Sequence, residues 1–195
     1  TYVGYMYGAA GQSSYEATHT NASDTTIKGA VDIWYSNNLI SYANKLADVG
    51  LCGDRSIQPG YGTALGYGTN QTGYGARLRL HTNKTPTFSC PNSSLDLYTL
   101  TINSIGNKKL IYPIGLITAD EVVYAGGLYD VENYTYYLQN GNNYWTMSPY
   151  YFYGSYARGF YVYSDGNPNN YIVNAGFRAC PVVSLKSETV ITGGT

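Results

Sequence analysis

Residues 142–185 read NNYWTMSPYYFYGSYARGFYVYSDGNPNNYIVNAGFRACPVVSL. Tyr, Asn, Ser and Gly crowd the middle of this stretch, and firmer segments flank it at residues 145–149 and 176–185. Tyr and Trp offer large, stiff contact areas, while Ser, Gly and Asn offer adaptable hydrogen bonds, a combination typical of antibody paratopes. The stretch therefore predicts a displayed binding surface rather than an active site.

The same stretch predicts a small antiparallel sheet. Residues 160–163 alternate, which places Phe160 and Val162 on one face and Tyr161 and Tyr163 on the other. Residues 164–167 (SDGN) form a strong hairpin-turn signal, so a returning strand is expected at 171–173. A third, more apolar strand is expected over 176–185, with an edge or break at its proline. We expect Phe160 and Val162 to face inward, and the two tyrosines to be exposed.

The remainder of the chain mixes helices and short strands. Ser23 or Asp24 is expected to cap a helix whose apolar stripe includes Ile27, Val31 and Trp34. A second helix is expected over 39–49. Short strands are expected at residues 1–7, 77–80, 95–105 and 110–114.

Residues 118–121 (TADE) match a capping box at the start of another helix. Thr118 can accept from the backbone N–H of Glu121, whose side chain can reach back to the cap. Asp120 and Glu121 resemble an acid–base pair, but acidic residues in a first helical turn are explained by the helix dipole. We interpret them as structural.

Composition limits the function classes. The 195 residues suit a single domain, and 44% hydrophobic content is enough for a sizeable core. Charged residues make up only 12%, and the net charge is −1, so no basic footprint for nucleic acid is present. No apolar run approaches the ~20 residues that span a bilayer. No metal-ligand spacing of Cys or His occurs, and no cofactor is expected.

The compartment is inferred from composition and cysteines. Residues 1–7 look like a strand rather than a leader peptide, which leaves a cytosolic protein or a trimmed ectodomain. Low charge with abundant Tyr, Asn, Thr and Gly favours the extracellular surface of a bacterium. Of the three cysteines, Cys52 and Cys90 lie in loop-like sequence and are expected to form a disulfide. Cys180 lies in an apolar strand and is expected to pack as a small hydrophobe.

The order of these motifs resembles a known family. The chain resembles the C-type-lectin-like variable proteins of diversity-generating retroelements. The resemblance rests on an N-terminal strand, two helical segments, the WTMSP motif that begins at Trp145, a Tyr/Asn/Ser-rich stretch and a following Gly-Phe-Arg. The resemblance includes pilin-like and surface proteins of gut bacteria, and the fold is shared with formylglycine-generating enzymes. It implies an α+β, C-type-lectin-like fold, with two helices packed on small antiparallel sheets and paired termini. The whole of 1–195 would be one domain.

In that family, copying with errors at adenines rewrites a segment near the C-terminus. The resemblance therefore implies a candidate variable ligand-binding segment at 145–178. Its candidate contact residues are Tyr150, Tyr151, Tyr153, Ser155, Tyr156, Arg158, Tyr161, Tyr163, Asp165, Asn167, Asn169, Asn170, Tyr171 and Asn174. The implied function is non-enzymatic binding, adhesin-like, of a protein or glycan receptor on another cell or phage host. The alternative is a minor pilin or pilus-tip subunit whose Tyr-rich face packs on a neighbour.

Two other functions are weighed against this interpretation. Calcium-dependent sugar lectins share the fold but need clustered carboxylates, whereas Asn167-Pro168-Asn169 has none, and Asp165 alone is a weak ligand. An enzyme of the formylglycine-generating type needs reactive cysteines, whereas Cys180 has no cysteine near it in the sequence. Neither function is favoured.

Overall fold

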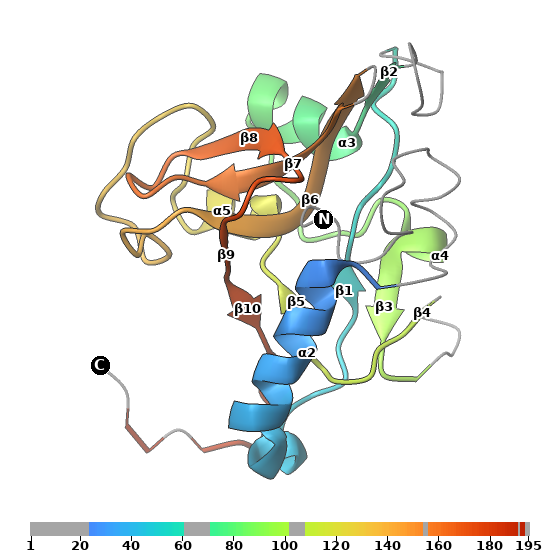
Figure 1. The fold of residues 1–195 in the computed structure, drawn as a ribbon, viewed down its shortest axis with the longest axis vertical. Coiled ribbons are helices and arrows are strands. Elements are labelled where there is room, and N and C mark those ends of the chain that lie inside the picture. The colour runs from blue at the N-terminus through green and yellow to red at the C-terminus, as the bar shows by residue number, and fades with distance from the viewer. Residues whose placement is uncertain (1–23, 61–70, 102–107, 154–155, 191, 194–195) are drawn as a thin grey trace.

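A computed structural model describes residues 24–60, 71–101, 108–153, 156–190 and 192–193 (Figure 1). For Leu95, Lys108, Tyr153 and Tyr156 only the backbone is described. The fold is α+β, with a few short helices and small, mainly antiparallel sheets. The strand expected at residues 1–7 lies outside the described residues, and so does its expected pairing with the C-terminal strand.

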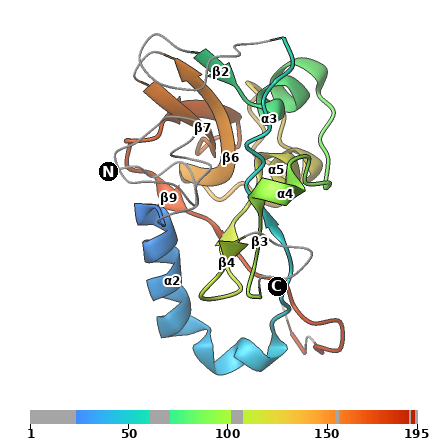
Figure 2. The ribbon, with the colours of Figure 1, turned by 90° about the vertical axis from the view of Figure 1, so that its right-hand side faces the viewer.

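Helix α2 spans Thr26–Asn38 and packs along one side of the molecule (Figures 1 and 2). Its cap is Thr25, one or two residues later than expected, and it buries Ile27, Val31 and Tyr35. The chain continues as a 3-10 helix, η1, at Ile40–Lys45, rather than as a full second helix. At the junction the Asn38 side chain donates to the Trp34 carbonyl at 2.7 Å. Such side-chain bonds compete with the helical ladder.

Residues 77–80 were expected to form a strand and are helical instead. Helix α3 at Gly75–Arg77 continues into the π-helix η2 at Leu78–Asn83, which ends at Lys84 in the left-handed region. Alternating RLRL also fits a helix, because Ala76 and Leu80, four residues apart, share one buried face. The tertiary contacts of Ala76 and Leu80 decide the outcome.

The other helices are short. Helix α4 spans Ser93–Asp96 and α5 spans Ala119–Tyr124. The capping box is confirmed, since Glu121 N donates to Thr118 Oγ1 at 3.1 Å and Thr118 N donates to Glu121 Oε2 at 2.7 Å.

The main sheet contains most of the Tyr-rich stretch and is strongly curled (Figures 1 and 2). Its antiparallel order is β2 (Gln71–Gly73), β6 (Tyr144–Tyr153), β7 (Tyr156–Val162) and β8 (Pro168–Ile172). The hairpin turn between β7 and β8 is confirmed, with Tyr163 N donating to Asn167 O at 2.9 Å. Gly166 has φ +83°, which glycine adopts without strain.

The expected strand over 176–185 is split in two. Strand β9 (Arg178–Ala179) pairs parallel to β6, whereas β10 (Pro181–Val182) pairs antiparallel to β5 (Gly115–Leu116). Pro181 has no N–H, so it cannot continue the ladder with β6. A further sheet joins β1 (Leu51–Cys52), β3 (Leu97–Thr99) and β4 (Lys108–Lys109).

The cysteine pairing is confirmed. Cys52 and Cys90 form a disulfide with a Cα–Cα distance of 5.6 Å. Cys180 is free and half-buried against a core cluster that includes Ile117, Val122 and Tyr144. Burial raises the pKa of the Cys180 thiol, as expected for an unreactive packing residue.

Both faces of the main sheet are covered. On one face, Phe160 packs with Ala76, Leu80 and Tyr129. On the opposite face, Tyr161 joins the large core cluster that contains Trp145 and residues of α2. The predicted alternation is therefore present, but neither face of β7 is open to solvent at its centre.

Candidate functional site

The structure corrects the predicted exposure of two tyrosines. Tyr161 is 0% exposed and Tyr150 is 6% exposed, so both belong to the core. Tyr161 is covered because the chain before β9 folds back over it, and the ring of Phe177 stacks on the Tyr161 ring with centroids 4.7 Å apart. The inward side of β7 therefore includes Tyr161 as well as Phe160 and Val162.

Other predicted contact residues lie at the surface or serve the turn. Tyr163 and Tyr171 are 36% and 44% exposed, and Asn174 is exposed. Asp165 accepts from the backbone of Asn167 at 2.9 Å, so both help to form the turn. Ser155 lies outside the described residues.

A hollow of about 230 Å³ gathers four of the predicted residues on one part of the main sheet. We call it the Arg158 hollow. It is lined by Arg77, Tyr150, Tyr151, Arg158 and Asn170. Strands β6, β7 and β8 supply the last four of these residues, and helix α3 supplies Arg77.

Two neighbouring strands position the polar floor of the hollow. In the β7–β8 register, Arg158 is opposite Ile172 and Phe160 is opposite Asn170, which makes Arg158 and Asn170 diagonal neighbours. Arg158 donates to Asn170 Oδ1 at 2.8 Å, and Asn170 Nδ2 donates to the Tyr129 hydroxyl at 2.7 Å. The guanidinium is thus held by a chain of hydrogen bonds that reaches the core.

Tyr150 forms a rigid wall of the Arg158 hollow. Its hydroxyl lies 2.8 Å from His81 Nδ1 and accepts from the Tyr129 hydroxyl at 3.1 Å. The Phe160 ring meets the Tyr150 ring edge-on, with centroids 5.0 Å apart. These contacts fix the ring at the border of the hollow.

Helix α3 and η2 supply the residues that the sequence did not single out. The Arg77 guanidinium carbon lies 5.7 Å from the centroid of the Tyr150 ring, and His81 stacks on Tyr129 with centroids 4.3 Å apart. Burial, followed by the positive charges of Arg77 and Lys84, lowers the pKa of His81. The charge of Asp130 opposes this shift, but the positive charges of Arg77 and Lys84 outweigh it at His81.

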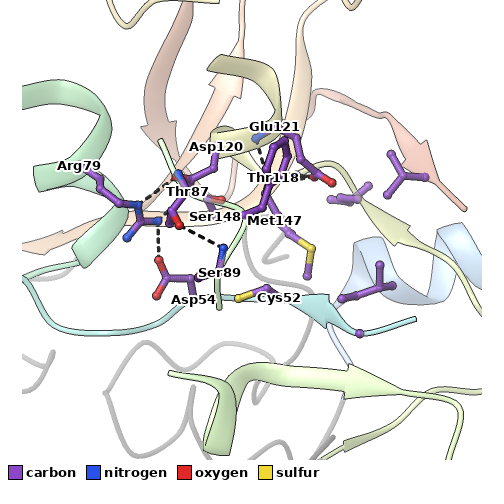
Figure 3. Close-up of a pocket in the computed structure, with 15 residues that line it drawn as sticks. Cys52, Asp54, Arg79, Thr87, Ser89, Thr118, Asp120, Glu121, Met147 and Ser148 are labelled. Carbon is purple, nitrogen blue, oxygen red and sulfur yellow. Dashed lines mark hydrogen bonds and ion pairs between the residues drawn. The ribbon is translucent and has the colours of Figure 1, made fainter. Parts of the chain in front are cut away.

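A second cavity, of about 90 Å³, lies where η2, α5 and β1 meet (Figure 3). Arg79 crosses it, bonding both carboxylate oxygens of Asp120 at 2.9 and 2.7 Å and Asp54 Oδ2 at 2.7 Å. Asp120 also accepts from the Thr87 backbone N–H at 2.8 Å. These groups satisfy one another, so we interpret the network as a clamp that fixes α3 and η2 beside the Arg158 hollow.

The described residues contain no group of three or more His, Cys, Asp or Glu that could hold a metal ion. Within those same ranges, no helix is long and apolar enough to cross a membrane.

Comparisons with protein-family models, with curated proteins and with solved structures gave no match. Function is therefore inferred from the geometry of the Arg158 hollow and from the sequence of the segment that forms it.

Proposed function

We propose that this chain is a non-enzymatic ligand-binding domain displayed on a bacterial surface, with the Arg158 hollow as the centre of its binding face. One observation carries the proposal. Four of the five residues that line the hollow come from the Tyr-rich segment whose composition predicts a binding surface.

The rigidity of the hollow supports this function. Binding sites built on strands and supported by packed neighbours hold their contact groups more accurately than loops do. Tyr150 is fixed by three hydrogen-bonding or stacking neighbours, and Arg158 is fixed by Asn170. Little conformational entropy would be lost when a ligand orders these side chains.

The Cys52–Cys90 disulfide supports an oxidising location, because such bonds form mainly in secreted and cell-surface proteins. We further propose that the fold is of the C-type-lectin-like type and that residues 145–178 are diversified by a retroelement. The α+β architecture, the capping box at Thr118 and the strand that begins at Tyr144 are compatible with this resemblance.

The test of the proposal is binding of the labelled domain to a panel of bacterial and host cells. Tyr151→Ala removes a wall of the Arg158 hollow, and Tyr137→Ala is the matched control, because Tyr137 is 91% exposed and does not line the hollow. We expect at least a tenfold loss of cell binding for Tyr151→Ala, since central aromatic contacts carry about 2 kcal/mol or more. Equal binding by the two variants would contradict the proposal.

A further inference from the structure

We propose that the Arg158 hollow recognises a carboxylated sugar unit, so that the ligand of this domain is an acidic glycan. The inference rests on the ligand-binding function proposed above and adds the chemical class of the ligand. It is argued from the charge of the hollow, the placement of its donors and its size.

Charge is the first argument. Arg158 and Arg77 both line one small hollow in a chain in which charged residues are scarce. Two other arginines are neutralised by buried aspartates, since Asp96 pairs with Arg55, and Asp54 and Asp120 pair with Arg79. Among the described residues, Arg158 has no carboxylate partner and bonds only the neutral amide of Asn170. A ligand carboxylate supplies the missing counter-charge.

The placement of donors is the second argument. A guanidinium presents five N–H donors in a planar fork that matches a carboxylate in a bidentate arrangement. Asn170 engages one nitrogen of Arg158 and thereby holds the fork in place. The carboxylate of Asp130 accepts a bond from Asn169 Nδ2 at 3.1 Å and is not among the residues that line the hollow. The positive potential that Arg77 and Lys84 impose on His81 agrees with attraction of an anion.

Size and lining favour a sugar over an acidic peptide side chain. The volume of about 230 Å³ is below the about 300–1,000 Å³ of pockets that enclose a whole drug-sized ligand, so one unit of a larger molecule fits. Tyr151 and Asn170, which carry a phenol and an amide, line the hollow together with the guanidinium. These groups match the ring and hydroxyls of a sugar, which an Asp or Glu side chain does not have.

The experiment uses an array of paired glycans. Glycans ending in N-acetylneuraminic, glucuronic or galacturonic acid are printed beside counterparts that lack only the acidic unit or its charge, together with Asp- and Glu-rich peptides. The proteins are the unaltered domain, Arg158→Gln and the matched control Arg178→Gln, which removes an exposed arginine that does not line the Arg158 hollow. Thermal unfolding of each protein checks that it is folded.

We expect the unaltered domain to bind acidic glycans at least tenfold more tightly than their neutral counterparts. Arg158→Gln should lose at least tenfold in that binding, whereas Arg178→Gln should keep it. Any of four results overturns the inference. The domain binds acidic and neutral glycans equally, binds only the acidic peptides, or binds no acidic glycan; or Arg158→Gln and Arg178→Gln lose acidic-glycan binding equally. If Tyr151→Ala still abolishes binding to cells, the ligand-binding function stands and only the acidic class fails. If Tyr151→Ala has no effect on any binding, both proposals fail.

Discussion

Tyr161 is enclosed by the rings of Trp145, Tyr163, Tyr171 and Phe177, at centroid distances of 4.6–5.9 Å. Truncating so large a buried ring leaves a cavity and removes its dispersion contacts. We therefore expect Tyr161→Ala to lower the free energy of unfolding by about 3–5 kcal/mol. Urea unfolding followed by circular dichroism measures the change.

The control for this change is Tyr137→Ala, because Tyr137 is almost fully exposed. Exposed substitutions usually alter stability by no more than about 0.5 kcal/mol. If Tyr161→Ala unfolds at the same urea concentration as Tyr137→Ala, Tyr161 is not buried, and the sequence-based expectation of an exposed Tyr161 is correct.

His81 gives the domain a specific pH dependence. Burial first, and then Arg77 and Lys84, lower its pKa in the folded protein, while the charge of Asp130 opposes them; the remaining polar neighbours are Tyr129 and Tyr150. Because the unfolded chain takes up the proton at a higher pH, His81 reduces stability as the pH falls through about 6.5. Above that pH both states are neutral and no penalty remains.

We expect His81→Gln to reduce the loss of unfolding free energy between pH 7.5 and pH 5.5. Urea unfolding at both pH values measures the loss, and an NMR titration of His81 measures its pKa directly. A His81 pKa above that of an unfolded peptide would reverse the sign and contradict the argument.

At the residue scale, the sequence anticipated part of the hollow that we propose as the site. The contact residues that the family resemblance implied include Tyr150, Tyr151, Arg158 and Asn170, and the structure brings these four together in one hollow. The sequence could not identify Arg77, which is about 80 positions before Arg158 in the sequence and in a segment that appeared to be a strand. It also misplaced Tyr161, since alternation assigns side chains to two faces but does not show which face another segment covers.

At the scale of elements, the Cys52–Cys90 disulfide links β1 to the segment before α4 across 38 positions. Closing a loop of this length in the unfolded chain is worth about 4 kcal/mol in the chain-entropy model. We expect the Cys52→Ser, Cys90→Ser double variant to be destabilised by roughly that amount, measured by urea unfolding.

Thiol counting provides the control. Unfolded but unreduced protein should react at one thiol, Cys180, and reduced protein at all three cysteines. Three reactive thiols before reduction would show that the disulfide is absent, and the main support for an oxidising compartment would then be lost.

The clamp formed by Arg79 joins η2 to α5 and to Asp54 (Figure 3). Asp120→Ala would leave the Thr87 N–H without its acceptor and remove one of two partners from a largely buried guanidinium. We expect a loss of about 3 kcal/mol. Because the clamp positions α3, ligand binding at the Arg158 hollow should also weaken.

The matched control is Thr118→Ala, which removes the cap of the same helix without touching Arg79. A lost N-cap costs about 1 kcal/mol, and ligand binding should stay unchanged. If both variants reduced ligand binding equally, the clamp would have no specific role in positioning the hollow.

Element prediction succeeded where a local interaction determines the structure. The capping box at Thr118 and the turn at 164–167 are short-range signals, and both are present. The strand expected at 77–80 failed because RLRL fits two periodicities, and the packing of Leu80 against Tyr129 and Phe160 selects the helix. The strand expected over 176–185 is split at Pro181. The residues before Pro181 pair with β6, whereas Pro181 and Val182 pair with β5.

At the scale of the whole molecule, the Arg158 hollow joins segments that are distant in the sequence. Strands β6, β7 and β8 carry the Tyr-rich segment, while α3 and η2 reach it from residues 75–83. The segment proposed to vary thus faces a wall that lies outside that segment. This arrangement allows side chains in the hollow to change while the core beneath them does not.

The last prediction follows from this separation of hollow-lining residues from core residues. If residues 145–178 are diversified, sequencing of the gene from independent isolates should find substitutions at Tyr151, Arg158 and Asn170. Substitutions should be rare at Phe160 and Tyr161, because a loss of about 3–5 kcal/mol there removes much of the about 5–15 kcal/mol that stabilises a domain. A reverse transcriptase gene should lie nearby, with a near-repeat of the coding segment that differs mainly at adenines. Substitutions spread evenly over buried and hollow-lining positions, or an invariant segment without such a repeat, would contradict diversification, and the Arg158 hollow would then be a site with one fixed ligand.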